Sequence, residues 1–334
     1  MTTLADVARA AGVSTMTVSN VLAGRAGKVS ERTAERVRAA IEATGYVPSA
    51  AARSLSARRS RMIALVVNGD GDVMTSTHDA RYVGELSRVL QDRGYVSLLV
   101  TAVDLAETTR SLRTWNVDGA IFVNTMAAQI ESLLDSHSVP MLFSDNYSEH
   151  PGVLTVRLDD AGGGALAARR LIEAGHRRAL FLGPLRGSAS VDDERWRGFR
   201  GEFADRGLPE PYADDLVHST TVESGVAVAE RVLALEPRPT AVFCSADDLA
   251  AGLLQGLRAH GVIVPRDMSV IGYDGFDVGR VTSPELTTIA QDITAKAARS
   301  VDVLLGALEG GDAVENDPLP VRFVERGSVG AAPA

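Results

Sequence analysis

The chain of 334 residues is acidic, with 34 lysines and arginines against 43 aspartates and glutamates and a formal net charge of −9. Its length and its hydrophobic content of 45% are sufficient for two domains with large cores. One cysteine and six widely spaced histidines exclude a disulfide framework and show no metal-ligand spacing. No run approaches the roughly 20 apolar residues that span a bilayer, and no apolar leader segment follows the N-terminus. We therefore expect a cytoplasmic protein without a membrane partner, metal or cofactor.

The first 45 residues predict a helix, a tight turn and a second helix, followed by a third helix that packs over the first two. Thr3 and Ser14 can each cap a helix N-terminus through a side-chain oxygen, Gly12 supplies the turn, and Ser30 begins the third helix. Apolar residues of the first two helices then face each other. The short, polar or adaptable side chains of residues 15–17, 19 and 20 are left on or near the outer face, where they suit phosphates and base edges. A capped helical hairpin without a DNA-binding role would show the same spacing.

Charge is distributed unevenly along the chain. Residues 1–61 contain ten lysines and arginines and four aspartates and glutamates, a net charge of +6, which leaves −15 on residues 62–334. A basic head on an acidic body is typical of a phosphate-binding module joined to a domain that does not bind DNA. Solvated surfaces alone can also produce such an imbalance.

From Thr3 to Leu55 the sequence resembles the LacI/GalR (lactose-repressor) family of bacterial transcription regulators. The resemblance rests on Asp-Val-Ala at 6–8, the Ala-Gly-Val-Ser, Thr-Val-Ser and Val-Leu frame at 11–22, Gly-Tyr-Val-Pro at 45–48 and Ala-Arg-Ser-Leu at 52–55. It implies a helix-turn-helix domain at 1–48, then a hinge helix and linker at 49–61. Two hinges would pair over the operator centre and insert Leu55 into the minor groove. Leu55 could instead be a linker residue that packs on the body.

Position by position, the resemblance implies base contacts from Thr15, Met16 and Asn20. An asparagine can bond adenine through two hydrogen bonds, whereas Met16 offers only apolar contact. Ala23 stands where many relatives carry asparagine, so the operator sequence is left open. The full set of implied DNA-binding residues is Thr3, Leu4, Ser14, Thr15, Met16, Thr17, Ser19, Asn20, Ala52, Arg53 and Leu55.

From residue 62 onward, short apolar runs alternate with amphipathic helical patterns, which predicts parallel sheets covered on both faces. The runs lie at 62–67, 95–100, 119–123, 140–143, 179–182, 241–244 and 269–273. Ligands of such sheets bind beyond the carboxyl ends of the strands. Asp145, Asp247 and Asp274 follow apolar runs at such ends, so they could converge on one cleft and accept hydrogen bonds from ligand hydroxyls or amines. Each could instead cap the following helix.

The resemblance continues over the body, through Gly-His-Arg at 175–177, Arg-Trp-Arg-Gly-Phe at 195–199, and the runs at 264–274 and 284–289. It implies a two-lobed α/β body of the periplasmic-binding-protein-like type at 62–334. Lobe 1 would comprise about 62–159 and 291–320, and lobe 2 about 160–290 and 321–330. An effector between the lobes would alter their angle and the pairing of the hinges. The candidate effector-binding residues are Asp145, Arg195, Asp247 and Asp274.

Three departures leave the effector open. Residues 68–79 are polar where many sugar-sensing relatives have aromatic residues, the loop at 186–194 is longer than in some relatives, and Asp159-Asp160 stands where Asp-Asn is common. We expect a sugar or related polar metabolite, which need be neither a plain hexose nor a purine. Asp70 and Asp72 lack the later acid of a calcium loop, and Gly162–Gly164 lack the Lys-Ser/Thr of a phosphate loop.

The sequence therefore predicts a homodimeric, sequence-specific transcription regulator, a repressor at a palindromic operator, controlled by a small polar effector. No nucleophile and base pair stands out, so we expect no enzyme. One alternative is a cytoplasmic small-molecule-binding protein or enzyme with the same body and a vestigial DNA-binding head. Another is an architectural protein that binds DNA without sequence preference, which the charge of −15 on the body disfavours.

Overall fold

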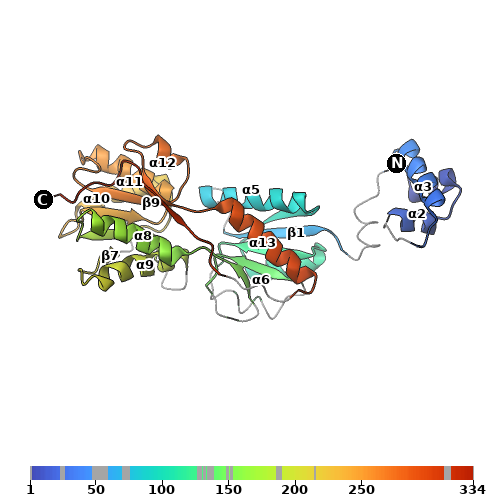
Figure 1. Cartoon of the computed structure of the whole chain (residues 1–334), viewed down its shortest axis with the longest axis horizontal. Helices are drawn as coiled ribbons and strands as arrows, with labels where there is room; N and C mark the ends of the chain where they lie inside the picture. Colours follow the sequence, from blue (N-terminus) through green and yellow to red (C-terminus); the bar gives the residue numbers. More distant parts are fainter. Residues whose placement is uncertain are drawn as a thin grey trace. The chain divides into compact units, whose positions relative to one another are not determined.

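The computed structural model describes residues 2–22, 27–46, 59–69, 76–125, 130, 133, 139–147, 150, 153–185, 190–213, 216–311 and 317–333. The chain divides into two compact units, Met1–Met62 with Asn116–Asp118, and Ile63–Trp115 with Gly119–Ala334. Figure 1 shows the first unit as helices only and the second as helices and sheets.

In the described part of the first unit, three helices form a bundle: α1 (Leu4–Ala11), α2 (Thr15–Leu22) and α3 (Glu31–Thr44). The predicted caps and turn are confirmed. Thr3 forms a capping box with Asp6, Gly12 ends α1 in the left-handed conformation at φ 61°, and the Ser14 hydroxyl accepts a hydrogen bond from the Thr17 amide at 3.1 Å. Buried apolar side chains of all three helices form one core: Val7, Ala8, Ala11, Val18, Val37 and Ala40.

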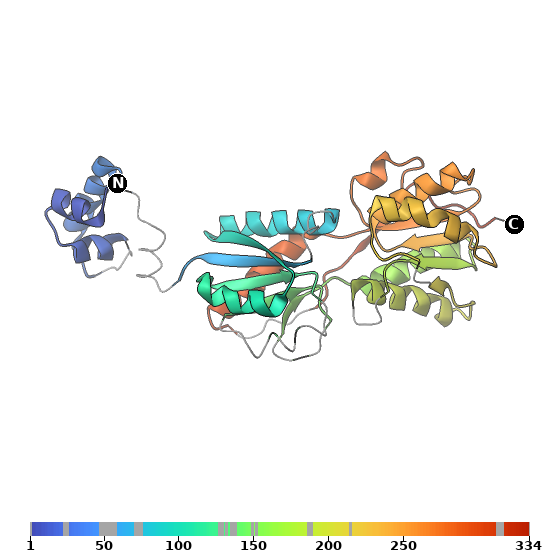
Figure 2. The ribbon, with the colours of Figure 1, turned by 180° about the vertical axis from the view of Figure 1, so that it is seen from behind.

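The second unit contains two sheets (Figures 1 and 2). The first has the strand order β2-β1-β3-β4-β5 and comprises β1 (Met62–Asn68), β2 (Val96–Ala102), β3 (Gly119–Val123), β4 (Met141–Ser144) and β5 (Leu154–Val156). Strands β1, β3, β4 and β5 pair in parallel. Helices α5 (Thr77–Asp92) and α13 (Ile293–Leu308) pack on this sheet and on each other, and α6 (Leu105–Thr114) follows β2.

The second sheet has the order β11-β10-β9-β8-β6-β7 and is parallel except at β11. Its strands are β6 (Ala179–Leu182), β7 (Tyr212–Ala213), β8 (Ala241–Cys244), β9 (Ser269–Asp274), β10 (Thr287–Ala290) and β11 (Arg322–Val324). Its helices are α8 (Asp160–Glu173), α9 (Val191–Asp205), α10 (Val222–Leu233), α11 (Asp247–Ala259) and α12 (Val278–Val281). The predicted two-lobed α/β body is confirmed.

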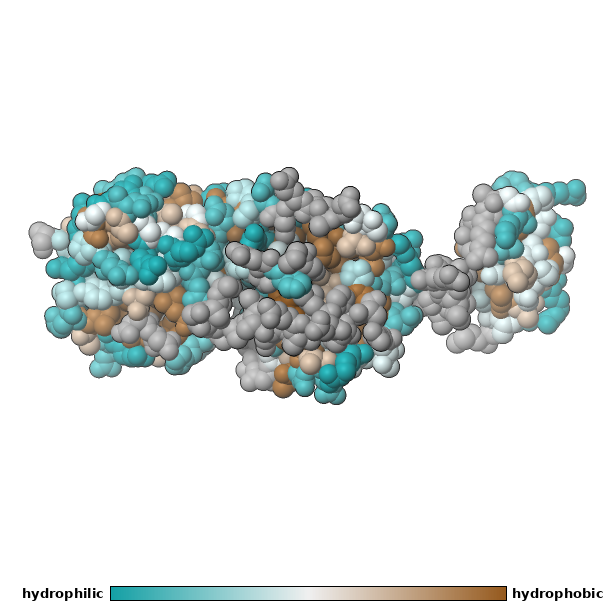
Figure 3. Space-filling model, turned by 90° about the horizontal axis from the view of Figure 1, so that it is seen from below, coloured by the Kyte–Doolittle hydropathy of each residue, from teal (hydrophilic) through white to brown (hydrophobic). Residues whose placement is uncertain are grey.

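The chain passes between the two sheets three times, after β5, after β10 and between α13 and β11 (Figure 1). Two of these segments lie side by side, because Leu158 and Leu319 form a parallel bridge and the Asp159 amide donates to the Leu319 carbonyl at 2.8 Å. No helix in the described part of the chain is long and apolar enough to cross a membrane. Hydrophilic residues are spread over both lobes on the face shown in Figure 3.

Glycines allow α8 and α9 to approach closely in the second lobe. A Cβ atom at Gly164 would lie 2.0 Å from the Arg195 carbonyl oxygen, and one at Gly198 would lie 1.8 Å from the Ala161 carbonyl oxygen. These neighbours are backbone atoms, which cannot rotate away as a side chain could. The contact fixes α9, and with it Arg195, against α8.

We predict that Gly198→Ala lowers the free energy of unfolding by about 1–3 kcal/mol or more, because the added methyl group must separate two packed helices. Gly201→Ala on the same helix is the matched control, since nothing lies within 4 Å of its Cβ position. The control should be neutral or stabilising by up to about 1 kcal/mol. Urea denaturation of both variants measures the difference, and equal effects would contradict the packing described.

His176 ties the C-terminal segment to the second sheet. The fully buried imidazole contacts the Thr240 hydroxyl through Nδ1 at 2.9 Å and the Ser269 hydroxyl through Nε2 at 2.9 Å, with the Gly330 carbonyl 3.2 Å from Nε2. Burial lowers the pKa of this histidine below its ordinary value. The folded state therefore favours the neutral form of the imidazole.

We predict that the stability of the second unit falls as the pH drops below about 6.5, because unfolding then lets His176 take up a proton. The histidine's contribution is complete above that pH and is lost as the pH falls toward its lowered pKa in the folded state. Urea melts from pH 7 to pH 5 should show a shallower dependence for His176→Gln than for the unaltered protein. An unchanged dependence would show that His176 is not a source of it.

Candidate functional site

The outer face of α2 carries the side chains predicted to contact DNA. Met16 is 66% exposed, and Thr15 is also exposed, while Thr17, Ser19 and Asn20 are half-buried at the margin of the helix. Val18 on the opposite face is fully buried in the bundle core, which fixes the direction of this polar face.

The other predicted DNA-binding residues are placed as follows. Thr3 and Ser14 are exposed at the two helix N-termini that they cap, and Leu4 is half-buried against the bundle core. Ala52, Arg53 and Leu55 lie outside the residues that the structure describes. The role of all these residues stays a prediction.

The second unit contains a cavity of about 680 Å³ where strands of both sheets end. Its wall includes residues at or just after the carboxyl ends of β1, β3, β4, β8 and β9, and residues of the first turns of α5, α9 and α11. Of the described lining residues, all but Gly69, Pro184, Val191 and Ala246 carry polar side chains, and none is phenylalanine, tyrosine or tryptophan. The arrangement follows from parallel pairing, which brings the carboxyl ends of neighbouring strands to one edge.

Three non-glycine residues at these strand ends have left-handed backbone conformations, Asn124 at φ 58°, Asp145 at φ 54° and Asp274 at φ 114°. Such conformations are unfavourable for residues with a Cβ atom and cluster at functional sites. All three residues line the cavity.

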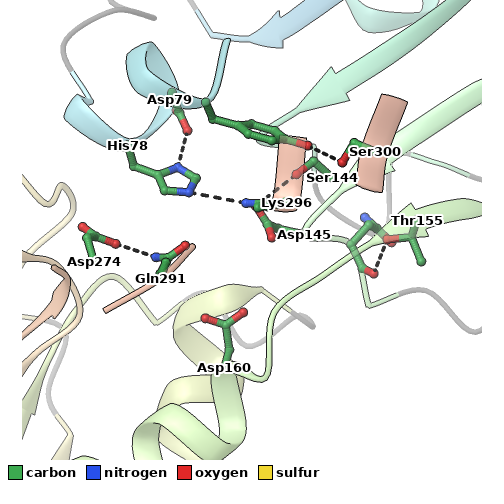
Figure 4. A network of polar contacts seen from close by, with 12 residues as sticks. His78, Asp79, Ser144, Asp145, Thr155, Asp160, Asp274, Gln291, Lys296 and Ser300 are labelled. Atoms are coloured by element: carbon green, nitrogen blue, oxygen red, sulfur yellow. Dashed lines mark hydrogen bonds and ion pairs between the residues drawn. The ribbon is translucent and has the colours of Figure 1, made fainter. Parts of the chain in front are cut away.

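Asp145 is held by a lysine that the sequence interpretation did not single out (Figure 4). Lys296 on α13 is fully buried, and its ammonium group forms an ion pair with Asp145 Oδ2 and lies 4.4 Å from the Tyr82 ring centroid. His78 Nε2 is 3.4 Å from the same ammonium group, and His78 Nδ1 is 3.0 Å from Asp79 Oδ1. Burial alone would raise the pKa of Asp145, but Lys296, His78 and Arg195 together outweigh burial and lower that pKa, with Lys296 the largest of the three. Asp145 is therefore an ionised acceptor.

Arg195 on α9 is placed at the cavity wall by buried partners. Its Nε donates to Asp160 Oδ1 at 2.8 Å and its Nη1 to the Ser245 carbonyl at 2.6 Å, while the guanidinium carbon lies 3.6 Å from the Tyr273 ring centroid. Asp160 also accepts a hydrogen bond from the Tyr147 hydroxyl at 2.5 Å. These contacts fix a planar cation in one orientation.

Asp274 and Asp192 differ from Asp145 in the direction in which the protein shifts their pKa. Asp274 accepts a hydrogen bond from Gln291 Nε2 at 2.6 Å and is 6% exposed. Burial raises the pKa of Asp274 well above its ordinary value, although Arg195 opposes the shift. Burial raises the pKa of Asp192 as well, again against the effect of Arg195. Among these three lining aspartates, the protein stabilises the ionised form of Asp145 and disfavours that of Asp192 and Asp274.

The structure does not bring Asp247 to this cavity. Its two carboxylate oxygens accept hydrogen bonds inside the protein, from the Phe276 amide at 2.7 Å and the Thr288 hydroxyl at 2.6 Å. Burial raises its pKa to about 7. The neighbouring Asp248 lines the cavity instead and accepts a hydrogen bond from the Thr77 hydroxyl at 2.7 Å, which joins the two lobes.

Asp145, Arg195 and Asp274 do lie in one cavity, as predicted, together with residues that the sequence interpretation missed: His78, Asp192, His218, Asp248 and the supporting Lys296. A signal for Lys296 existed. It occupies the buried face of an amphipathic helix, in helical spacing with Ile293 and Ser300. Within the described ranges there is no cluster of histidine, cysteine and acidic residues that could hold a metal ion.

The chain matches two protein families over most of its length. Residues 3–49 match the family of bacterial regulatory proteins called the lacI family, and residues 168–329 match the periplasmic binding protein-like domain. The HTH-type transcriptional repressor PurR of Vibrio parahaemolyticus is 34% identical over 312 residues, covering 91% of each chain. The ribose operon repressor of Haemophilus influenzae is 30% identical, also covering 91% of each chain.

Among solved structures, a dimer of the Lac repressor bound to operator and the anti-inducer ONPF is similar to this chain. Its TM-score is 0.85 with 27% identity, and the similarity covers 99% of each chain. The similarity therefore extends over both units of this chain.

We predict that Lys296→Met lowers the free energy of unfolding by about 3–5 kcal/mol, because it leaves Asp145 buried without its cation. Adding Asp145→Asn should recover part of the loss, since the unpaired charge is then removed. Arg88→Met is the control, because it breaks exposed ion pairs with Glu85 and Asp92 and should cost no more than about 1 kcal/mol. Urea melts of the unaltered protein, the two single variants and the double variant measure these free energies of unfolding. An equal loss for Lys296→Met and Arg88→Met would contradict the account.

Proposed function

Because the chain belongs to the lacI family of bacterial regulatory proteins, we propose that it is a transcription repressor that reads its operator with the outer face of α2 and responds to a ligand in the cavity. The observation that carries the proposal is the combination of an outward polar face on α2 with a polar cavity at the strand ends of the body. The first can read base edges, and the second can bind a small polar molecule.

On the DNA side, Thr15, Met16 and Asn20 read bases, while phosphates are contacted by Thr3, Ser14, Thr17 and Ser19. Their exposure and their position beside two helix N-termini support these roles, because amide groups at helix N-termini attract phosphate. A helix in one major groove covers a short site, so a two-fold dimer reads an inverted repeat. Leu55 then supplies the apolar wedge at the centre.

On the ligand side, the effector is a sugar or a related polar metabolite. Asp145, Arg195 and Asp274 would accept and donate hydrogen bonds to its hydroxyl groups. The similarity to the ribose operon repressor of Haemophilus influenzae supports a sugar-like ligand, as does the polar wall of the cavity. A ligand that bridges both lobes would shift their relative angle and so change the affinity for DNA.

The experiment that tests the proposal is selection of bound sites from random duplexes by the purified full-length protein at a stated salt concentration. We predict one palindromic motif. Asn20→Ala should lose the preference at one position of each half-site, at a cost of about 1–3 kcal/mol. Glu35→Gln is the control, because Glu35 is exposed on α3 and does not belong to α2; it should select the unaltered motif. Recovery of no motif would refute the regulator and favour a ligand-binding protein or enzyme.

A further inference from the structure

The charge of the cavity wall restricts the chemistry of the effector. The described lining residues include five aspartates and one arginine, a formal charge of −4. The N-termini of α5, α9 and α11 also contribute to the wall. Each such terminus is equivalent to roughly half a positive charge, so together they offset only part of the aspartates' charge. The wall as a whole favours a ligand with a positive charge.

The two cations nearest the cavity are already engaged. Arg195 donates to Asp160 and to the Ser245 carbonyl, and the fully buried Lys296 forms an ion pair with Asp145. An anionic ligand would therefore compete with the buried Asp160 and Asp145 for these cations. The wall therefore disfavours phosphorylated and carboxylated ligands.

Two of the lining carboxylates, those of Asp192 and Asp274, are buried without a cation of their own. Within the described part of the chain, neither Asp192 nor Asp274 forms an ion pair with a lysine or arginine, although Arg195 is close enough to influence both. Asp160 has taken the direct ion pair with Arg195. A cation beside Asp192 and Asp274 would supply the partner that they lack.

Other lining groups can form hydrogen bonds with the hydroxyl groups of a ligand. Thr125 is 6% exposed, and its hydroxyl has no hydrogen-bond partner. The buried Oδ1 atom of Asp145 also has no hydrogen-bond partner. The first can donate and accept, and the second accepts from a ligand hydroxyl. The described wall offers no phenylalanine, tyrosine or tryptophan on which a flat base or aromatic group could stack.

We infer that the effector is a small polyhydroxylated amine, of the amino sugar class, whose protonated amino group binds beside Asp192 and Asp274 while its hydroxyls bond Asp145 and Thr125. The inference rests on the proposed function, in that this cavity is taken as the effector site. It goes further by selecting a cationic ligand over neutral and anionic ones. A cavity of about 680 Å³ accommodates a molecule of this size.

The test is isothermal titration calorimetry of the full-length protein at neutral pH. The probes are glucosamine, galactosamine, mannosamine and the ring amine deoxynojirimycin, each compared with its neutral parent sugar, and the amino sugars also with their N-acetyl derivatives. At least one amine should bind about tenfold or more tightly than its neutral counterpart, because hydrogen bonds between charged partners are the stronger ones. Glucose phosphate should not bind measurably.

Variants locate the amino group. Asp274→Asn and Asp192→Asn should each reduce the affinity for the amine about tenfold or more and change that for the parent sugar little. Asp277→Asn is the control, since it removes a carboxylate whose side chain is 89% exposed and does not line the cavity. Circular dichroism and thermal melts establish that the variants are folded.

Equal or tighter binding of a neutral, acetylated or phosphorylated probe would overturn the inference, and so would the absence of binding by every amine. These outcomes are separable from failure of the proposed function. A protein that selects an operator but shows no preference for amines remains a regulator with a different effector. A protein that binds an amine but selects no operator retains the ligand site without the regulatory role.

Discussion

The second unit depends on how it accommodates carboxylates buried at one edge of two parallel sheets. Parallel strands end together, so the polar residues that follow them meet in one cavity, where burial disfavours ionised carboxyl groups and like charges repel. Asp145, Asp192, Asp274 and the deeper Asp160 all lie there with little exposure. Each one must find a cation, a hydrogen-bond donor or a proton. Much of the packing around the cavity serves this requirement.

The solutions differ from one carboxylate to the next. Lys296 pairs with Asp145 and Arg195 with Asp160, and both cations are positioned by helices that pack closely on their neighbours. Gln291 supplies only a neutral donor to Asp274. The same wall therefore contains an ionised acceptor, a fixed guanidinium group and carboxyl groups that favour a proton or a ligand cation. Ligand specificity then follows from the arrangement of buried partners rather than from an aromatic platform.

Much of the fold was readable from the sequence because its signals are local. The caps Thr3 and Ser14, the turn at Gly12 and the apolar runs of the longer strands follow from residues adjacent in the chain. The short strands β5, β7, β10 and β11 were not among the predicted runs. They have two to four residues each, and β5, β10 and β11 contain threonine or arginine beside their apolar residues, so no continuous apolar run marks them.

The site was predictable in part for the same reason. A position after a strand indicates that a side chain lies at the correct edge, which holds for Asp145 and Asp274. It does not indicate where the side chain turns. The Asp247 carboxylate turns inward to Phe276 and Thr288, and Asp248 lines the cavity instead. That choice depends on segments about 30 and 40 residues away in the chain, as the pairing of Lys296 with Asp145 depends on a helix from a distant part of it.

The most direct measurement is the titration of individual carboxyl groups by carbon NMR of protein labelled at aspartate, with resonances assigned through Asp145→Asn and Asp274→Asn. We predict that the pKa of Asp145 lies below the ordinary value of an aspartate and that the pKa of Asp274 lies well above it, because of the two only Asp145 has a buried cation of its own. If Asp145 and Asp274 titrated together, or in the reverse order, the division of charge on which the cavity's ligand chemistry rests would be wrong.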